Sequence, residues 1–251
     1  MHRLLAVAAS LALSVPAAAA EITVLCAYGF SGAMQEIAPR FERATGHRLS
    51  LGYAALGDAV KRVEAGDVAD LLVLPSQGLG QLARAGKLGP EPATPVAVSR
   101  MGLAVPKGAA KPDISTPEQV KRLLLAAPAV TTPDPAGGGA SATHFQRLFE
   151  TMGIAAQVKP KLVYSVEGSR GLAKVVADRK AIVALNQLQA LKAVPALEIV
   201  GPLPAPLQQE TVFAATLLPA ARDAEAARAF VRYLRSPEAA ELIRAQGLDP
   251  A

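Results

Sequence analysis

Four short segments of the 251-residue chain carry residue types that could bind a ligand, at residues 29–32, 55–58, 135–141 and 168–171. All four contain glycine, which lets the backbone approach a ligand, and three contain a serine hydroxyl that can donate a hydrogen bond. Each segment stands just before an expected helix, whose first turn offers unpaired N–H groups and the positive end of the helix dipole. This chemistry favours a small anion. The same residue types also form ordinary helix caps and turns.

Two charged residues in these segments lead to opposite expectations. The guanidinium of Arg170, together with the hydroxyl of Ser169, could clamp a carboxylate or a phosphate-like oxyanion, or Arg170 could be a surface residue beside a helix start. The carboxylate of Asp58 would repel an anion if it faced the ligand. We expect Asp58 to face solvent at a helix start instead, a position that acidic residues favour.

Strands and helices alternate along the chain, and these elements must position the four segments. Apolar runs predict strands at residues 22–27, 49–53, 69–74, 101–105, 129–132, 161–166, 181–185 and 211–217. Helical spacing and end signals predict helices after these strands, with Thr116 as a cap before Pro117 and with Ser236 opening the last helix. This alternation of strands and helices predicts mainly parallel sheets covered on both faces, with ligands bound beyond the carboxyl ends of the strands.

The alternating pattern starts again after residue 100, which predicts an α/β protein of two similar lobes with a ligand cleft between them. We expect residues 21–100 plus 207–251 to form lobe one and residues 101–206 to form lobe two. The proline-rich segment at 201–206 is expected to be a stiff connector that carries the chain back between the lobes.

Composition narrows the classes of protein to which the chain can belong. Residues 1–20 combine a basic start, an apolar segment and an alanine-rich end, which predicts a secretory signal cleaved after Ala20. Loss of Arg3 with this signal leaves 25 basic and 21 acidic residues, a net charge of +4. Dispersed basic residues, few aromatic residues and the absence of Trp argue against a nucleic-acid partner. The chain has one cysteine and three histidines, which are few side chains from which to build a metal site, and we expect no metal or other cofactor.

Several stretches match, in order, the motifs of one known family. They are residues 21–24 (EITV), 31–38 (SGAMQEIA), 63–71 (VEAGDVADL), 134–135 (DP), 167–171 (EGSRG) and 236–240 (SPEAA). Each motif is weak alone, but their order and spacing extend over nearly the whole mature chain. On these residues the chain resembles the periplasmic molybdate-binding proteins of ABC importers.

The resemblance implies a type II periplasmic binding fold, in which two lobes close on a ligand held by serine hydroxyls and by backbone N–H groups at helix starts. The chain departs from the family pattern at Gly29, where a binding serine is expected, at 55–58, which lack a hydroxyl pair, and at Asn186-Gln187, where a ligand tyrosine is usual. The ligand therefore stays open between a molybdate- or tungstate-like oxyanion and a small organic acid. The candidate ligand-binding residues are Tyr28, Gly29, Ser31, Leu56, Gly57, Pro135, Gly138, Ser141, Ser169, Arg170, Asn186 and Gln187.

The resemblance also implies a function: a monomeric solute-binding protein in the periplasm that delivers a small anion to an inner-membrane ABC permease. Some relatives of the family are aconitate isomerases, so an isomerase on the same scaffold is the alternative, and it would need a positioned base. His144, Asp134 and Tyr28 are the candidates for that base, and we assign no catalytic residue. A sensory or interaction module that has lost transport is a third interpretation. The chain contains no nucleophile elbow, Walker motif or dinucleotide glycine pattern.

Overall fold

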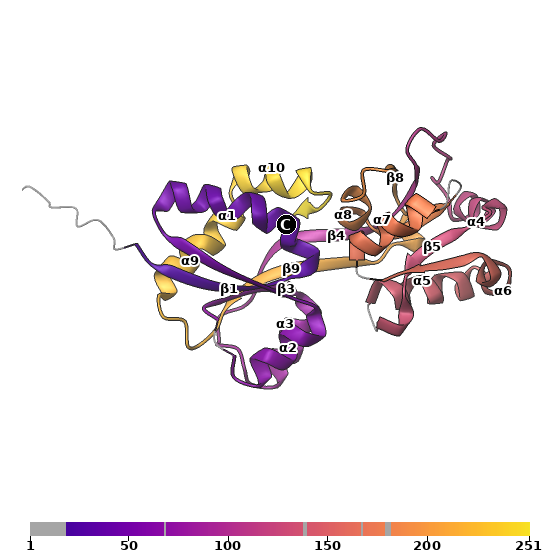
Figure 1. Ribbon diagram of the computed structural model, residues 1–251. Coiled ribbons are helices and arrows are strands. Elements are labelled where there is room, and N and C mark those ends of the chain that lie inside the picture. The colour runs from indigo at the N-terminus through magenta and orange to yellow at the C-terminus, as the bar shows by residue number, and fades with distance from the viewer. Residues whose placement is uncertain (1–18, 68, 138–139, 167, 179–181) are drawn as a thin grey trace, which may run out of the picture.

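The computed structural model describes residues 19–67, 69–137, 140–166, 168–178 and 182–251. The chain forms two lobes joined by two long strands (Figure 1). Each lobe has a sheet with helices on its faces, as the sequence predicts. The expected secretory signal falls almost wholly outside the described residues, and so does Gly138.

Lobe one is built on a sheet whose strands lie in the order β2-β1-β3-β9-β4. These strands are β1 (Glu21–Ala27), β2 (Arg48–Ala54), β3 (Leu71–Pro75), β4 (Thr94–Pro106) and β9 (Glu210–Leu217), and β10 (Asp249–Pro250) also pairs with β4. The strand β1 runs parallel to β2 and β3, whereas β9 is antiparallel to both of its neighbours.

The helices of lobe one lie on two sides of this sheet (Figure 1). On one side lie α1 (Ser31–Thr45), α9 (Ala224–Leu234) and α10 (Pro237–Ala245), and on the other lie α2 (Leu56–Glu64) and α3 (Ser76–Arg84). Met34, Ile37 and Phe41 recur along one face of α1 and are fully buried, because this spacing turns them toward the sheet. The ring of Phe41 packs against that of Phe230 from α9, with centroids 4.8 Å apart.

Lobe two continues the sheet through β4 in the order β4-β7-β5-β6. Its further strands are β5 (Val130–Pro133), β6 (Leu162–Ser165), β7 (Val183–Gln187) and β8 (Leu197–Pro202), the last of which pairs with β4. The strand β5 runs parallel to β6 and β7. The helices are α4 (Pro117–Ala126), α5 (Ala140–Thr151), α6 (Ala155–Val158), α7 (Gly168–Asp178) and α8 (Leu188–Lys192). The described parts of both lobes also contain the 3-10 turns η1 (Tyr28–Phe30), η2 (Pro135–Gly137), η3 (Lys159–Lys161) and η4 (Ala205–Leu207).

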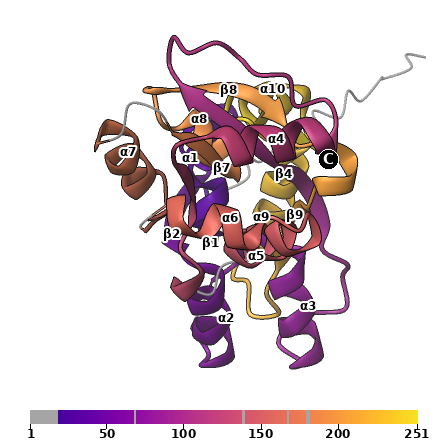
Figure 2. The ribbon, with the colours of Figure 1, turned by 90° about the vertical axis from the view of Figure 1, so that its right-hand side faces the viewer.

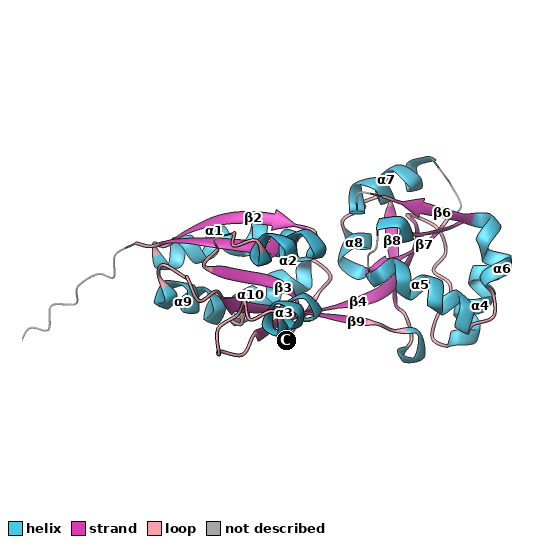
Figure 3. Cartoon of the chain, turned by 90° about the horizontal axis from the view of Figure 1, so that it is seen from below, coloured by secondary structure: helices cyan, strands magenta, loops and turns pink. Residues whose placement is uncertain are grey.

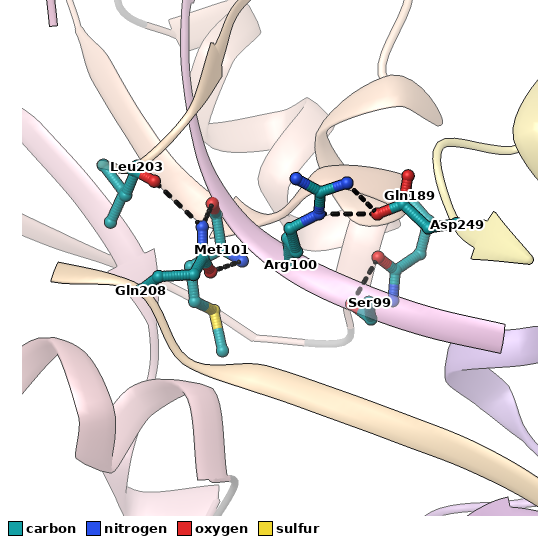
Figure 4. A network of polar contacts seen from close by, with 7 residues as sticks. All are labelled: Ser99, Arg100, Met101, Gln189, Leu203, Gln208 and Asp249. Carbon is teal, nitrogen blue, oxygen red and sulfur yellow. Dashed lines mark hydrogen bonds and ion pairs between the residues drawn. The ribbon is translucent and has the colours of Figure 1, made fainter. Parts of the chain in front are cut away.

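The two lobes are connected by β4 and β9, which run side by side between them (Figure 3). The strand β4 pairs with β9 as far as Arg100 and with β7 and β8 from Met101 or Gly102 onward. This change of partners supports a lobe boundary after residue 100, which we keep as a proposal. At the same place polar contacts join β4 to Gln189 of α8 and to Gln208, which precedes β9 (Figure 4).

Helix capping follows the sequence, whereas several segments differ from the predicted pattern. Thr116 and Gln119 form a reciprocal capping box at the start of α4, and Ser236 caps α10, as predicted. The strand β4 begins at Thr94 rather than near 101, because a bulge after Pro95 lets the strand continue past the proline. The helix α8 and the strand β8 were not predicted, and Gly201 and Pro202 of the expected connector belong to β8.

Candidate functional site

Three adjoining cavities lie between the lobes. The first inner cavity has a volume of about 580 Å³ and the second inner cavity about 370 Å³, and both are lined by Tyr28, Gly29, Ser141 and Gln187. The outer cavity has a volume of about 730 Å³ and shares lining residues such as Leu56 with the first inner cavity. Neighbouring cavities share lining residues, so the three adjoin, and together they are called the cleft below.

The starts of six helices line this cleft. Lobe one contributes the first turns of α1, α2 and α3 through Ser31, Leu56 and Ser76, and lobe two contributes the starts of α5, α7 and α8. Among the described residues no side chain caps the N-terminus of α2 or α3, so their first N–H groups are left for water or for a ligand. This arrangement gathers hydrogen-bond donors and the positive ends of helix dipoles around one space.

A series of hydrogen-bonded side-chain amides and hydroxyls lies along the cleft. Gln187 Nε2 donates to Thr211 Oγ1 at 3.3 Å, and Gln189 Nε2 donates to Gln187 Oε1 at 3.1 Å. Gln189 Oε1 accepts from Ser99 Oγ at 2.8 Å, and Gln189 Nε2 also lies 3.5 Å from the Gly29 carbonyl oxygen (Figure 4 shows Gln189 and Ser99). This series of hydrogen bonds therefore connects β4 and β9 with the first loop of lobe one and with the start of α8.

Charge is distributed unevenly along the cleft. Among the described residues that line the two inner cavities, Glu210 is the only charged one, and it is exposed on β9. The outer cavity is lined by Asp58, Lys61 and Arg147 as well as by His144. Apart from the Glu210 carboxylate, the inner cavities offer a ligand only neutral groups, and the basic side chains of the cleft lie in the outer cavity.

Most of the predicted ligand-binding residues lie in this cleft. Those that line one or more of its cavities are Tyr28, Gly29, Ser31, Leu56, Gly57, Ser141, Ser169, Asn186 and Gln187. Pro135 and Arg170 do not line the three cavities as the described residues form them, and Arg170 is exposed. Gly138 lies outside the described residues. The binding role of each of these residues stays a prediction.

The polar side chains of the second inner cavity differ in whether they already make hydrogen bonds to other groups of the protein. Ser31 Oγ donates to the Tyr28 carbonyl at 2.7 Å, so it must turn away from that oxygen to donate to a ligand. The buried Asn186 accepts the Gln187 N–H through Oδ1 at 2.8 Å. The hydroxyls of Ser141 and Ser169 make no hydrogen bond within the parts of the chain that the structure describes, which leaves them to donate to a ligand.

Sequence reasoning missed several residues of the cleft. Ser76 and Gln77 open α3 after β3, and the rule that ligands bind where strands end and helices begin applies to them equally. Gln209 and Thr211 line the first inner cavity from the segment that leads into and begins β9. No local pattern marks them, because they reach the cleft only through the path of β9 between the lobes.

Of the three candidate bases, His144 and Tyr28 line the cleft. His144 Nε2 lies 3.0 Å from the Leu207 carbonyl oxygen, and since a carbonyl only accepts, the hydrogen of a neutral ring sits on Nε2 and Nδ1 is left as an acceptor. Burial lowers the pKa of His144, the charge of Arg147 acts in the same direction, and the contact with Leu207 opposes them. Asp134 is not among the lining residues of the cleft, and its Oδ1 accepts from the Ala136 N–H at 2.9 Å.

The described residues contain neither a metal-binding cluster nor a membrane-spanning helix. No three His, Cys, Asp or Glu side chains in these ranges are placed to hold a metal ion. No helix in the described parts is long and apolar enough to cross a membrane. The one cysteine, Cys26, is buried in β1, and burial raises the pKa of its thiol far above the usual range.

Comparison with known proteins gives matches along almost the whole chain. Residues 22–249 match the family of bacterial extracellular solute-binding proteins. The chain is 32% identical to an aconitate isomerase of a Pseudomonas species over 258 residues, with 98% of this chain and 95% of that protein covered. It is 28% identical to the molybdate-binding protein ModA of Azotobacter vinelandii over 245 residues, with 94% and 92% covered.

The fold is shared with solved structures whose sequences are distant. A Clostridium difficile protein assigned as the substrate-binding domain of a molybdenum ABC transporter superposes with a TM-score of 0.78 at 14% identity, covering 93% of this chain and 100% of that one. The resemblance predicted from the sequence motifs is confirmed, and so is the two-lobed fold. The chain belongs to the family of bacterial extracellular solute-binding proteins.

Proposed function

We propose that this protein is a periplasmic substrate-binding protein that binds a small anion between its lobes and delivers it to an inner-membrane ABC permease. The observation that carries the proposal is the convergence of six helix starts, three from each lobe, on one cleft. Uncapped N–H groups and serine hydroxyls can hold an oxyanion or a carboxylate there without a basic side chain. The family match and the molybdate-binding relative support the same function.

Closure of the lobes would complete the site. The hydroxyl of Ser31 belongs to lobe one and those of Ser141 and Ser169 to lobe two, so an anion between them receives donors from both lobes only when the lobes come together. The two crossing strands provide the hinge for such a movement (Figure 3). Export through a signal cleaved after Ala20, the monomeric state and the permease as partner are parts of the proposal that rest on the sequence and the family.

The anion site is tested by calorimetric titration of the mature protein with molybdate, tungstate, sulfate, phosphate, citrate and aconitate. Loss of a hydroxyl that donates to a bound anion weakens binding by about tenfold, since hydrogen bonds to charged groups contribute about 1.5–3 kcal/mol. We expect this weakening for Ser141→Ala and Ser169→Ala. The matched control is Ser50→Ala, because Ser50 is exposed on β2 and does not line the cleft. Equal affinity in all three variants contradicts the site.

An isomerase of a small tricarboxylate is the second candidate function. The aconitate isomerase relative favours it, and so does His144, whose lowered pKa keeps a neutral ring available as a base in the cleft. The test is proton NMR of cis- and trans-aconitate incubated with the wild-type protein and with His144→Gln. Interconversion by the wild type that is lost in His144→Gln supports an enzyme, whereas binding without interconversion supports the substrate-binding role alone.

A further inference from the structure

The outer cavity carries basic side chains that the inner cavities lack. It adjoins the first inner cavity, with which it shares the lining residues Ala55, Leu56, Gln77, Ala140 and Gln209. Its walls also include Lys61 of α2 in lobe one and Arg147 of α5 in lobe two. A ligand bound at the helix starts of the first inner cavity could therefore extend into the outer cavity without displacing protein.

The walls of the outer cavity are helix faces turned toward one another. On α5 the lining residues recur every three or four positions and so lie along one face, namely Ala140, Thr143, His144 and Arg147. On α2 and α3 the spacing is likewise helical, with Asp58 and Lys61 on the former and Gln77 and Gln81 on the latter. Viewed from the end of lobe two, α2 and α3 extend beyond the lower edge of α5 (Figure 2). Lys61 of lobe one and Arg147 of lobe two therefore line the same cavity.

Lys61 and Arg147 are not neutralised by protein partners. Neither side chain makes an ion pair or a hydrogen bond within the ranges that the structure describes. Asp58 is exposed and lies in the same cavity, so one carboxylate faces two cations there. The amides of Gln77, Gln81 and Gln209 add neutral donors. The outer cavity thus has an excess of positive charge at its walls.

We propose that the outer cavity is a second anion subsite, formed by Lys61 and Arg147, and that the ligand of this protein is a di- or tricarboxylic acid. This inference rests on the proposed function, because one carboxylate of the ligand occupies the helix starts of the inner cavities. A second carboxylate then lies between Lys61 and Arg147. Since these two cations belong to different lobes, the carboxylate also draws the lobes together.

A single tetrahedral oxyanion makes no such use of the outer cavity. All its charge sits at one centre, so an oxyanion held in an inner cavity meets Lys61 and Arg147 only through screened long-range attraction. The two classes of ligand therefore respond differently to loss of these cations. This difference separates the subsite from a general effect of positive charge on anion binding.

The experiment measures the affinity of two probe classes by calorimetric titration. Citrate and trans-aconitate represent polycarboxylates, and molybdate and sulfate represent single-centre oxyanions. The variants are Lys61→Gln and Arg147→Gln, and the control is Arg84→Gln, which removes an exposed cation of α3 that does not line the cleft. Thermal unfolding of each variant establishes that it folds. The charge-retaining variants Lys61→Arg and Arg147→Lys provide a second readout.

We expect Lys61→Gln and Arg147→Gln each to weaken polycarboxylate binding by about tenfold, as loss of one charge-assisted contact does. Arg84→Gln should leave the affinity within about twofold, and Lys61→Arg should restore most of it. Equal polycarboxylate affinity in all these variants overturns the subsite. Binding of molybdate or sulfate without any binding of polycarboxylates also overturns it, while the proposed function stands. If none of the anions binds the wild type, the proposed function itself is wrong and the subsite falls with it.

Discussion

The side-chain amide of Gln208 makes hydrogen bonds with both the N–H and the carbonyl of Met101. The Met101 N–H donates to Gln208 Oε1 at 2.6 Å, and Gln208 Nε2 donates to the Met101 carbonyl at 3.0 Å (Figure 4). The same Nε2 donates to the Leu203 carbonyl at 3.0 Å. Met101 is the first residue of β4 that pairs with β7, and Gln208 precedes β9, so this amide joins β4 to the segment that leads into β9.

Replacement of the Gln208 amide should lower the stability of the protein. Gln208→Ala leaves the Met101 N–H and the Leu203 carbonyl without this partner, whereas the Met101 carbonyl still accepts from the Leu203 N–H. We expect a loss of about 2 kcal/mol in the free energy of unfolding. Chemical denaturation measures this loss. Gln35→Ala is the matched control, since Gln35 is exposed on α1 and makes no side-chain hydrogen bond with the described residues. Equal stability of the two variants would show that the contact contributes nothing.

Asp70 should make the stability of lobe one depend on pH. Its carboxylate is almost fully buried and accepts from the Thr23 N–H at 2.7 Å and from the Arg222 N–H at 2.8 Å. Burial acts to raise the pKa of Asp70, but the hydrogen bonds from Arg222 and Thr23 outweigh it and lower the pKa below its usual value. The ionised group therefore stabilises the fold above the unfolded pKa of about 3.9, and this contribution is lost as the pH falls through the folded pKa.

The corresponding variant is Asp70→Asn. We expect it to lower the free energy of unfolding at pH 7 by about 2 kcal/mol and to flatten the loss of stability in acid. Denaturation curves between pH 7 and pH 2 measure both effects. Asp67→Asn serves as the control, because Asp67 pairs with Arg62 at an exposed position. An acid limb as steep in Asp70→Asn as in the wild type would contradict the assignment.

Tyr28 should report ligand binding by fluorescence. Its side chain is 63% exposed and lines both inner cavities, so closure of the lobes on a ligand buries it. The chain has four Tyr and no Trp, which makes tyrosine emission observable. We expect a saturable change in emission on ligand addition that Tyr28→Phe abolishes. Tyr164→Phe should keep the change, since Tyr164 is on β6 and does not line the cleft.

Arg170 separates two interpretations of α7. The residue follows Ser169, which lines the second inner cavity, yet its own side chain is exposed and has no ion pair within the described residues. The clamp hypothesis predicts that Arg170→Ala weakens anion binding by about tenfold. The surface interpretation predicts unchanged affinity. Calorimetric titration decides between them, and an unchanged dissociation constant would remove Arg170 from the site.

The parts of the fold that the sequence predicted are those with strong local signals. The continuous apolar run of β3 and the cap and proline at the starts of α4 and α10 leave little choice of structure. The first half of β4 was missed because Pro95 reads as a break, and only the bulge beside it keeps the strand going. The helix α8 is five residues long, too short for a periodic pattern to appear.

The residues of the candidate site also fall into those that a local sequence signal indicated and those that no such signal indicated. Glycine and serine beside strand ends indicated loops that do line the cleft, such as those of Tyr28 and Ser141. Gln209 and Arg147 could not be found from the sequence, because nothing local to them points to a ligand. They enter the cleft through the crossing of β9 and through the arrangement of α5 opposite α2, which are properties of the assembled lobes.

The most direct test of anion binding between the lobes is to fill the cleft. Ser141 lines both inner cavities, and Ser141→Trp places an indole in the space that the anion needs. Calorimetry should show one anion bound per wild-type molecule and no binding by Ser141→Trp, while the variant unfolds at a temperature close to that of the wild type. An unchanged dissociation constant in Ser141→Trp would contradict a site between the lobes.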